Sequence, residues 1–215
     1  DNDRFGADLG ATLEAAFGAD ERARYWAIYE ELRRESGFAD YLGTLQRFRV
    51  GLDNDPSLLQ MSGYLLDYPF ADRLYPHALE TVAHLRTLGP TAILSDGDVV
   101  FQPHKIRRAG LWAALGGEVL VYLHKQKMLV AMQQRYPAAH YVMVDDKPQI
   151  LAAMKQHLGR KLTTVFVRQG HYAAASAGET IAPAPDFTIA CIGDLRRRKL
   201  EDFLPRAPAI SLPAD

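Results

Sequence analysis

From about residue 91 onward, short runs of apolar and β-branched residues alternate with segments that carry a helical pattern of apolar positions. Each run is followed by polar residues, as strands that alternate with helices are. Such alternation predicts a parallel sheet covered by helices on both faces, because parallel strands need a long crossover between them. The predicted strands span residues 91–94, 119–123, 141–144, 163–167 and 187–192.

The third of these runs, Tyr141-Val142-Met143-Val144, is apolar at every position. Continuous apolar character is typical of parallel strands that are buried on both faces, so we predict a Rossmann-like α/β core. Right-handed crossovers place the carboxyl ends of such strands at one edge of the sheet. Ligands of open α/β sheets bind in the crevice outside that edge, so polar residues that directly follow a strand are the candidates for function.

Before residue 91 the apolar residues recur with the spacing of amphipathic helices. Two such stripes are Tyr25, Ile28, Tyr29 and Leu32, and Tyr41, Leu45 and Phe48. Glycines and a proline interrupt the pattern, which predicts three or four short helices between about residues 7 and 70. A further stripe around Val82, ended by Gly89 and Pro90, predicts a helix that leads into the first strand. We therefore expect a small helical domain over residues 1–70 and an α/β core over residues 71–215.

The composition narrows the class of protein. The chain has 215 residues, 48% of them hydrophobic, a formal net charge of -1 and one cysteine, Cys191. These values predict a globular protein without an internal disulfide and give no indication of a nucleic-acid partner. No apolar run approaches the roughly 18 residues of a membrane span, and no signal segment opens the chain. We expect a cytoplasmic enzyme that acts on a small molecule as a monomer or homodimer.

The first candidate site is Ser95-Asp96-Gly97, which follows the predicted strand at residues 91–94. The Ser95 hydroxyl and the backbone N–H groups after it can donate hydrogen bonds to an oxyanion, and Gly97 can adopt a positive φ. The segment therefore predicts a phosphate-binding turn with Ser95, Asp96 and Gly97 as substrate-binding residues. The alternative is an ordinary turn between a strand and a helix.

The second candidate site is the acidic doublet Asp145-Asp146, which directly follows an apolar strand. Two neighbouring carboxylates repel each other unless a cation offsets their charge, and oxygen ligands suit Mg²⁺. Since side chains alternate in a strand, we expect Asp146 to bind the metal directly and Asp145 to act through water or hydrogen bonds. The alternative is that one carboxylate caps the helix that begins near Pro148.

The third candidate is Lys125, which follows the strand at residues 119–123. Its ammonium group could neutralise the charge of a phosphate or of an attacking carboxylate. Lys127 lies two positions further along and would face nearly the opposite way on a helix, so only one of the two lysines can reach the crevice. We favour Lys125 as the catalytic lysine, and the alternative is a solvated helix start.

Weaker candidates lie elsewhere in the chain. Arg168, Gly170 and His171 follow the fourth predicted strand and could reach a substrate, although a surface loop is the more ordinary interpretation. Tyr25, Trp26 and Tyr29 could line a pocket in the helical domain, but their place in a helical stripe favours a role in the core.

Ser95, Lys125 and Asp145-Asp146 follow successive strands in an order that resembles motifs two, three and four of the haloacid dehalogenase-like (HAD) superfamily. Residues 74–80 resemble the helix before motif two of that family, and residues 105–111 resemble the helix after it. The resemblance covers about residues 74–204, and the preceding helices stand where members of the family insert a helical cap. It implies a HAD-like core with a cap domain, a hydrolase activity, Mg²⁺ as cofactor and Ser95, Lys125 and Asp146 as catalytic residues.

The first motif of the family is a strand that ends in Asp-x-Asp, and nothing in this chain matches it fully. Asp1 and Asp3 have the spacing, but no strand precedes them. We expect the chain to be truncated at its N-terminus before or within motif one. The missing strand would lie between the strands of motifs two and four, so its removal would leave unpaired edges unless the two halves of the sheet close up and pair directly.

The resemblance leaves three functions open. The first is a Mg²⁺-dependent phosphatase for a small phosphomonoester, with an aspartyl-phosphate intermediate on a nucleophile upstream of this chain. The second is a 2-haloacid dehalogenase, which would use Ser95 and Lys125 without a metal. The third is a non-catalytic binding module that lacks motif one. In all three cases we expect Ser95, Lys125 and Asp146 to converge at one edge of the sheet.

Overall fold

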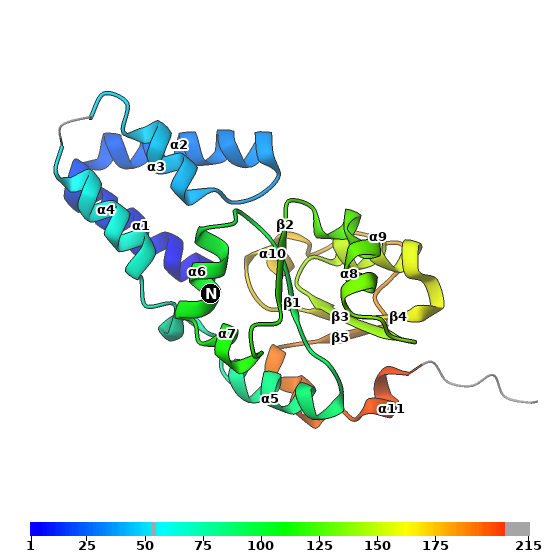
Figure 1. Cartoon of the computed structure of the whole chain (residues 1–215). Helices are drawn as coiled ribbons and strands as arrows, with labels where there is room; N and C mark the ends of the chain where they lie inside the picture. Colours follow the sequence, from blue (N-terminus) through cyan, green and yellow to red (C-terminus); the bar gives the residue numbers. More distant parts are fainter. Residues whose placement is uncertain (53–54, 205–215) are drawn as a thin grey trace, which may run out of the picture. The chain divides into compact units, whose positions relative to one another are not determined.

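The computed structural model describes residues 1–52 and 55–204, which form two compact units, Asp1–Met132 and Gln133–Asp215. The last part of the predicted core domain, residues 205–215, lies outside the described residues. The first unit contains the α-helices α1 (Asn2–Phe17), α2 (Ala19–Ser36), α3 (Tyr41–Phe48), α4 (Ser57–Asp67), α5 (Ala78–Leu88), α6 (Phe101–Arg108) and α7 (Leu111–Ala114) (Figure 1). It also contains the 3-10 helices η1 (Phe70–Arg73) and η2 (Lys125–Lys127). Its two strands are β1 (Ile93–Asp96) and β2 (Val119–Tyr122).

The second unit follows α8 (Leu129–Arg135), which spans the junction between the units. Its strands are β3 (Tyr141–Asp145), β4 (Leu162–Val167) and β5 (Phe187–Ile189), and its helices are α9 (Pro148–Leu158), η3 (Gly159–Lys161), α10 (His171–Ala175), η4 (Ile192–Arg197) and α11 (Leu200–Phe203). All five strands predicted from the sequence are thus present, and so are the predicted helices before residue 91. The observed fold is α/β, as expected.

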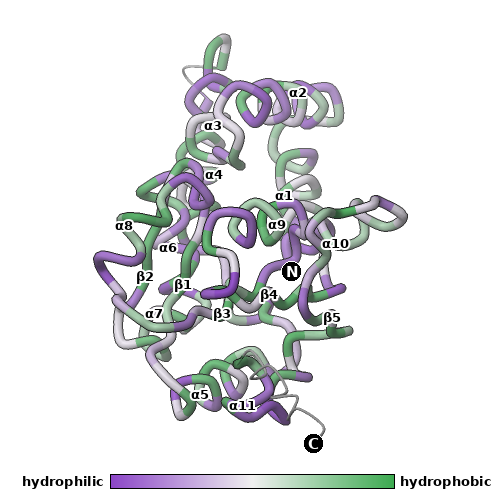
Figure 2. The backbone as a smooth tube through the Cα atoms, turned by 90° about the vertical axis from the view of Figure 1, so that its right-hand side faces the viewer, coloured by the Kyte–Doolittle hydropathy of each residue, from purple (hydrophilic) through white to green (hydrophobic). Residues whose placement is uncertain are grey.

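Local signals in the sequence fix the ends of the N-terminal helices. The Asp1 carboxylate accepts a hydrogen bond from the Arg4 N–H at the start of α1, and Asp40 caps α3 by accepting from the Gly43 N–H. Helix α2 ends at Gly37, whose φ of 81° is the left-handed conformation that closes many helices. Much of the chain along α2 is hydrophilic, and the apolar side chains Tyr25 and Tyr29 are those it buries (Figure 2).

Aromatic side chains form the core between these helices. The Phe5 ring contacts four other rings, at centroid distances from 4.8 Å for Tyr68 to 6.0 Å for Phe101. Phe101 belongs to α6, the helix that follows β1, so one aromatic core joins the N-terminal helices to the β1–β2 segment. The domain boundary predicted near Phe70 therefore falls inside the first compact unit, and the division into a cap and a core stays a prediction.

An ionic cluster joins α1 to the segment that follows α4. Arg73 donates a hydrogen bond to Asp8 at 2.7 Å and another to the Tyr68 hydroxyl at 2.6 Å, and Tyr68 donates to the same Asp8 carboxylate. The hydrogen bonds from Tyr68 and Arg73 lower the pKa of Asp8, while burial and the bond to Asp8 raise the pKa of Tyr68 to about 12. The cluster thus keeps Asp8 ionised where the chain leaves the helices for the first strand.

The strands form two separate parallel sheets instead of the single predicted sheet. β1 pairs with β2, with Ser95 opposite Val121, and β4 lies between β3 and β5, with Asp145 opposite Phe166. Among the described residues, β1 and β3 share no ladder, and the alternative in which the two halves of the sheet close up and pair directly stays a prediction.

The expectation that strands are buried on both faces holds for one strand only. β4 is buried at every position but Phe166, because it has a ladder partner on each side and α9 packs against it. β3 has one ladder partner, and its Val142 side chain is 41% exposed, so the prediction is wrong for this strand. A continuous apolar run does not distinguish a central strand from an edge strand, because both can be rich in valine.

No helix in the described part of the chain is long and apolar enough to cross a membrane.

Candidate active site

The carboxyl ends of β1 and β2 bring together the residues predicted around motifs two and three. Asp96 is the last residue of β1, and its Oδ1 accepts a hydrogen bond of 2.6 Å from the Lys125 N–H, just after β2. The Lys125 Nζ lies 3.4 Å from the Leu94 carbonyl oxygen. The structure therefore places Ser95, Asp96 and Lys125 at one edge of one sheet, because parallel strands end on the same side.

The Ser95 hydroxyl has partners within this edge. It lies 3.2 Å from the Asp96 carbonyl, to which it donates, and it accepts a hydrogen bond of 2.7 Å from Gln102 Nε2 on α6. Sequence reasoning missed Gln102, because a lone glutamine in a helix carries no distinguishing pattern. Gln102 holds the hydroxyl oxygen in place and leaves it able to accept or donate after a rotation of its hydrogen.

Gly97 has a structural role at the end of β1. Its N–H donates to the Tyr122 carbonyl at 3.0 Å, which extends the β1–β2 ladder by one residue, and a role for Gly97 in substrate binding stays a prediction. Glycine is needed at this position because the backbone φ is positive and because a side chain here would lie too close to Gln102. Its φ is 152°, and a Cβ at this position would lie 3.0 Å from the Cβ of Gln102. Gly97 thus allows Gln102 to approach Ser95.

Lys125 is buried, with 8% of its surface exposed, whereas Lys127 is exposed. Both lie in the short 3-10 helix η2, whose three-residue turn points them in different directions. The alternative of a solvated helix start does not hold for Lys125, since a lysine is seldom buried without a partner for its charge. The burial favours Lys125 over Lys127 as the lysine of the site.

The acidic doublet lies at the carboxyl end of β3 in the second unit. Asp145 is the last residue of the strand, and its Oδ1 accepts a hydrogen bond of 2.9 Å from the Lys147 N–H. Helix α9 begins at Pro148 with Lys147 as its N-cap and without a side-chain capping bond. The N-cap residue itself thus makes no side-chain capping bond, and the alternative in which one carboxylate of the doublet caps α9 stays a prediction. That these carboxylates converge with Ser95 and Lys125 stays a prediction, since the doublet belongs to the other compact unit.

The donor set of the doublet is suited to Mg²⁺. Among residues 1–52 and 55–204 no group of three or more His, Cys, Asp or Glu side chains is gathered as a metal site. Mg²⁺ does not need such a group, because it usually keeps several waters and is held by one or two carboxylates together with substrate phosphate oxygens. Asp146, with Asp145 beside it, supplies carboxylates of that number and type.

Three buried polar atoms in the motif-two and motif-three segments have no hydrogen-bond partner among the described residues: Asp98 Oδ2, His104 Nε2 and Gln126 Oε1. The other oxygen of Asp98 accepts hydrogen bonds from the N–H groups of Val100 and Phe101, where the chain enters α6. Native proteins pair nearly all buried polar atoms, so such atoms tend to concentrate at functional sites.

Lys105 on α6 is another residue that sequence reasoning missed. Its Nζ donates a hydrogen bond of 2.6 Å to Asn2 Oδ1 and lies 5.6 Å from the centre of the Phe70 ring. Burial lowers the pKa of Lys105 to about 8. In the sequence Lys105 stands in a basic run with Arg107 and Arg108, a pattern that is typical of a solvated helix face. No local signal therefore distinguishes Lys105 from an ordinary surface lysine.

His124, directly before Lys125, contacts the end of helix α2. A Cβ placed on Gly37 would lie 2.9 Å from Cε1 of the His124 ring. The close approach requires glycine at position 37, in addition to the requirement set by its φ of 81°. The contact ties the N-terminal helices to the segment that carries Lys125, within the first compact unit.

We predict that Gly37→Ala lowers the free energy of unfolding by about 1–3 kcal/mol more than Gly110→Ala does. The difference is expected because the new methyl group at position 37 would overpack against the His124 ring. Gly110 is a matched control, because its φ and ψ of 77° and −6° resemble the 81° and 2° of Gly37, and nothing lies within 4 Å of a Cβ there. Urea denaturation measures both changes. His124→Ala in the Gly37→Ala background should recover most of the difference, and equal losses for the two glycines would contradict the prediction.

The weaker candidates fall into two groups. Tyr25 is fully buried, and Trp26 packs against the same core, as a structural role requires. Arg168 and Gly170 line a cavity of about 580 Å³ beyond the carboxyl end of β4. His171 stacks edge-to-face on Tyr172 at 5.5 Å.

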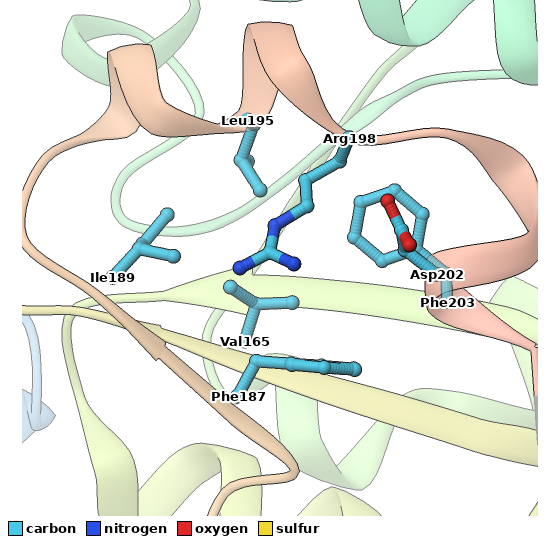
Figure 3. Close-up of a pocket in the computed structure, with 7 residues that line it drawn as sticks. All are labelled: Val165, Phe187, Ile189, Leu195, Arg198, Asp202 and Phe203. Atoms are coloured by element: carbon cyan, nitrogen blue, oxygen red, sulfur yellow. The ribbon is translucent and has the colours of Figure 1, made fainter.

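A smaller hollow lies on one face of the second sheet, between β4, β5 and α11 (Figure 3). Val165, Phe187 and Phe203 are among the side chains around it, and the Arg198 guanidinium lies 5.6 Å from the Phe187 ring centre. It is too tight to admit a water molecule, so it is a packing feature of the core and not a ligand site.

No family model matches the chain, and no curated protein matches it. A solved structure from Burkholderia xenovorans LB400 is similar, with 56% sequence identity over 93% of this chain and 93% of that one and a TM-score of 0.85. That protein is described as a haloacid dehalogenase-like hydrolase, a description that names no substrate. At this identity and coverage the similarity extends from the fold to the family, as the order of Ser95, Lys125 and the acidic doublet predicts. The chain therefore belongs to the haloacid dehalogenase-like hydrolases.

Proposed function

We propose that the protein is a Mg²⁺-dependent phosphatase for a small phosphomonoester. We expect the reaction to pass through an aspartyl-phosphate intermediate on the nucleophilic aspartate of the family's first motif. The observation that carries the proposal is the acidic doublet at the end of β3. Asp145 is the last residue of β3 and Asp146 follows it directly, so two adjacent carboxylates stand at the carboxyl end of this strand. A metal-binding role suits two adjacent carboxylates, because a cation offsets their mutual repulsion, whereas dehalogenation needs no metal.

Asp146 is the residue that would bind Mg²⁺ directly. The Asp145 Oδ1 already accepts the Lys147 N–H, which fixes the turn and favours a supporting role for Asp145. When bound, Mg²⁺ supplies positive charge that offsets the charge of the transferring phosphoryl group. The remaining work falls to side chains of this chain.

Ser95 and Lys125 would act on the phosphoryl oxygens. The Ser95 hydroxyl, whose position is set by Gln102, donates a hydrogen bond to one oxygen. Lys125 is held by its backbone bond to Asp96, and its buried ammonium group balances negative charge at the edge of the sheet. A charged group that is already held in position does not have to reorient during the reaction, so little free energy is spent on reorganisation. Such preorganised groups contribute strongly to catalysis. The N-terminal helices would exclude bulk water as a cap domain.

The test is an assay of the full-length gene product with p-nitrophenyl phosphate, in Mg²⁺ and in EDTA. We expect turnover that depends on Mg²⁺ and that an Asp146→Asn variant largely lacks. A parallel assay measures halide release from 2-chloropropionate without metal. Halide release that is indifferent to EDTA would establish the dehalogenase alternative, and the absence of both activities over a broad panel of metabolite phosphates would favour the non-catalytic binding module.

A further inference from the structure

The second unit has a cavity that the proposed function does not yet use. It has a volume of about 580 Å³ and opens beyond the carboxyl end of β4. Its lining includes Phe166, Arg168 and Ser176, together with the small residues of α10 and the following turn. The volume lies within the range of roughly 300–1,000 Å³ that small-molecule sites occupy, and the lining combines apolar walls with a few polar groups, as such sites do.

The cavity is next to the acidic doublet in the sheet. Phe166, which lines it, is the ladder partner of Asp145. Arg168 comes two residues after Phe166, directly past the end of β4, so spacings of about 4.8 Å between strands and 3.3 Å per residue put its Cα at roughly 8 Å from that of Asp145. A phosphoryl group at the doublet and a second group at Arg168 could belong to one molecule of a few carbon atoms.

Side-chain contacts connect α10 and the turn after it, which line the cavity, to the turn that follows the doublet. Lys147 Nζ lies 3.9 Å from the centre of the Tyr172 ring on α10. Gln149, in the first turn of α9, donates hydrogen bonds to Ser176 and Glu179. The position of the cavity relative to the two carboxylates is therefore fixed by side-chain contacts within this unit and not only by the path of the loop.

Charge in the cavity points to the nature of the ligand. Arg168 is exposed, and within the part of the chain that the structure describes its guanidinium has no hydrogen bond or ion pair. The other charged residue of the lining, Glu179, has a partner in Gln149. An unpaired guanidinium at the mouth of an apolar cavity favours a carboxylate, which it can bind through two parallel hydrogen bonds.

We propose that this cavity binds the leaving alcohol of the substrate and that the alcohol carries a carboxylate, which Arg168 binds. This inference rests on the proposed phosphatase function and adds the substrate class: small phosphomonoesters with a carboxylate a few bonds from the phosphoryl group. Arg168 is then a specificity-determining residue that contacts the substrate away from the reacting atoms.

The test compares Arg168→Gln with the wild-type full-length protein on two kinds of substrate. For phosphomonoesters that carry a carboxylate, such as 3-phosphoglycerate and phosphoserine, we expect KM to rise about tenfold with kcat nearly unchanged. For glycerol 3-phosphate and p-nitrophenyl phosphate, which have none, KM should change by less than about twofold. Arg160→Gln is the matched control, because Arg160 is an exposed arginine before the amino end of β4. It should leave both kinds of substrate unaffected.

A binding measurement separates this inference from the proposed function. Titration calorimetry with glycerate, which has the carboxylate but no phosphate, needs no turnover, and Arg168→Gln should weaken the binding about tenfold. If no variant hydrolyses any phosphomonoester while glycerate still binds in an Arg168-dependent way, the phosphatase function fails and the cavity assignment stands. Equal effects of Arg168→Gln on both kinds of substrate, or glycerate binding that is absent or independent of Arg168, would overturn the inference.

Discussion

Asp146→Asn is expected to lower kcat/KM for p-nitrophenyl phosphate about a hundred- to a thousandfold in the full-length protein. Asparagine keeps the size of the side chain but carries no negative charge, so it binds a divalent cation far more weakly. The Mg²⁺ concentration that gives half-maximal activity should rise as well. Steady-state kinetics over a range of Mg²⁺ concentrations measures both effects, and a thermal melt confirms that the variant is folded.

Asp145→Asn is the informative comparison. Its Oδ1 accepts the Lys147 N–H, and an asparagine oxygen can accept the same bond, so the turn before α9 should persist. We expect a loss of about tenfold, as for partners that support a metal ligand. A larger loss for Asp145→Asn than for Asp146→Asn would reverse the two assignments. Full activity in both variants would remove the metal site from the doublet.

Lys125→Met is expected to lower kcat about a hundred- to a thousandfold, with a smaller change in KM. Methionine fills much of the space of the lysine stem without its charge. The hydrogen bond from the backbone N–H of residue 125 to Asp96 remains, since it does not depend on the side chain. The substitution therefore tests the ammonium group separately from the loop that carries it.

Lys127→Met provides the control for this experiment. Lys127 lies in the same 3-10 helix but is exposed, so its replacement should change kcat by less than about twofold. Single-turnover measurements alongside steady-state kinetics show whether the chemical step is the one that slows. If the two methionine variants have the same rates, the buried lysine has no special role in catalysis.

The sequence predicted the elements and their order because the relevant signals are local. Gly89 and Pro90 end α5 as expected, and apolar runs mark all five strands to within about two residues at most ends. The order of Ser95, Lys125 and the doublet also predicted the family, which the similarity to a solved member then showed. Each of these inferences depends only on the residues within a short segment of the chain.

The remaining features depend on contacts between distant segments. The exposure of Val142 follows from the position of β3 at the edge of its sheet, which an apolar run does not encode. The Gly97 amide is engaged by Tyr122, and Gln102 reaches Ser95, only because β2 and α6 pack beside β1. The contact between His124 and Gly37 joins residues far apart in the chain. A single sequence offers no pattern for any of these pairs.

The contacts of Lys147 with Tyr172 and of Gln149 with Glu179 have a thermodynamic consequence. Because these contacts join the turn after the doublet to the loop that lines the cavity, a cation at Asp146 and a ligand in the cavity would act on the same contacts. Reciprocity then requires that Mg²⁺ strengthen the binding of a carboxylate ligand by the same factor by which that ligand strengthens the binding of Mg²⁺.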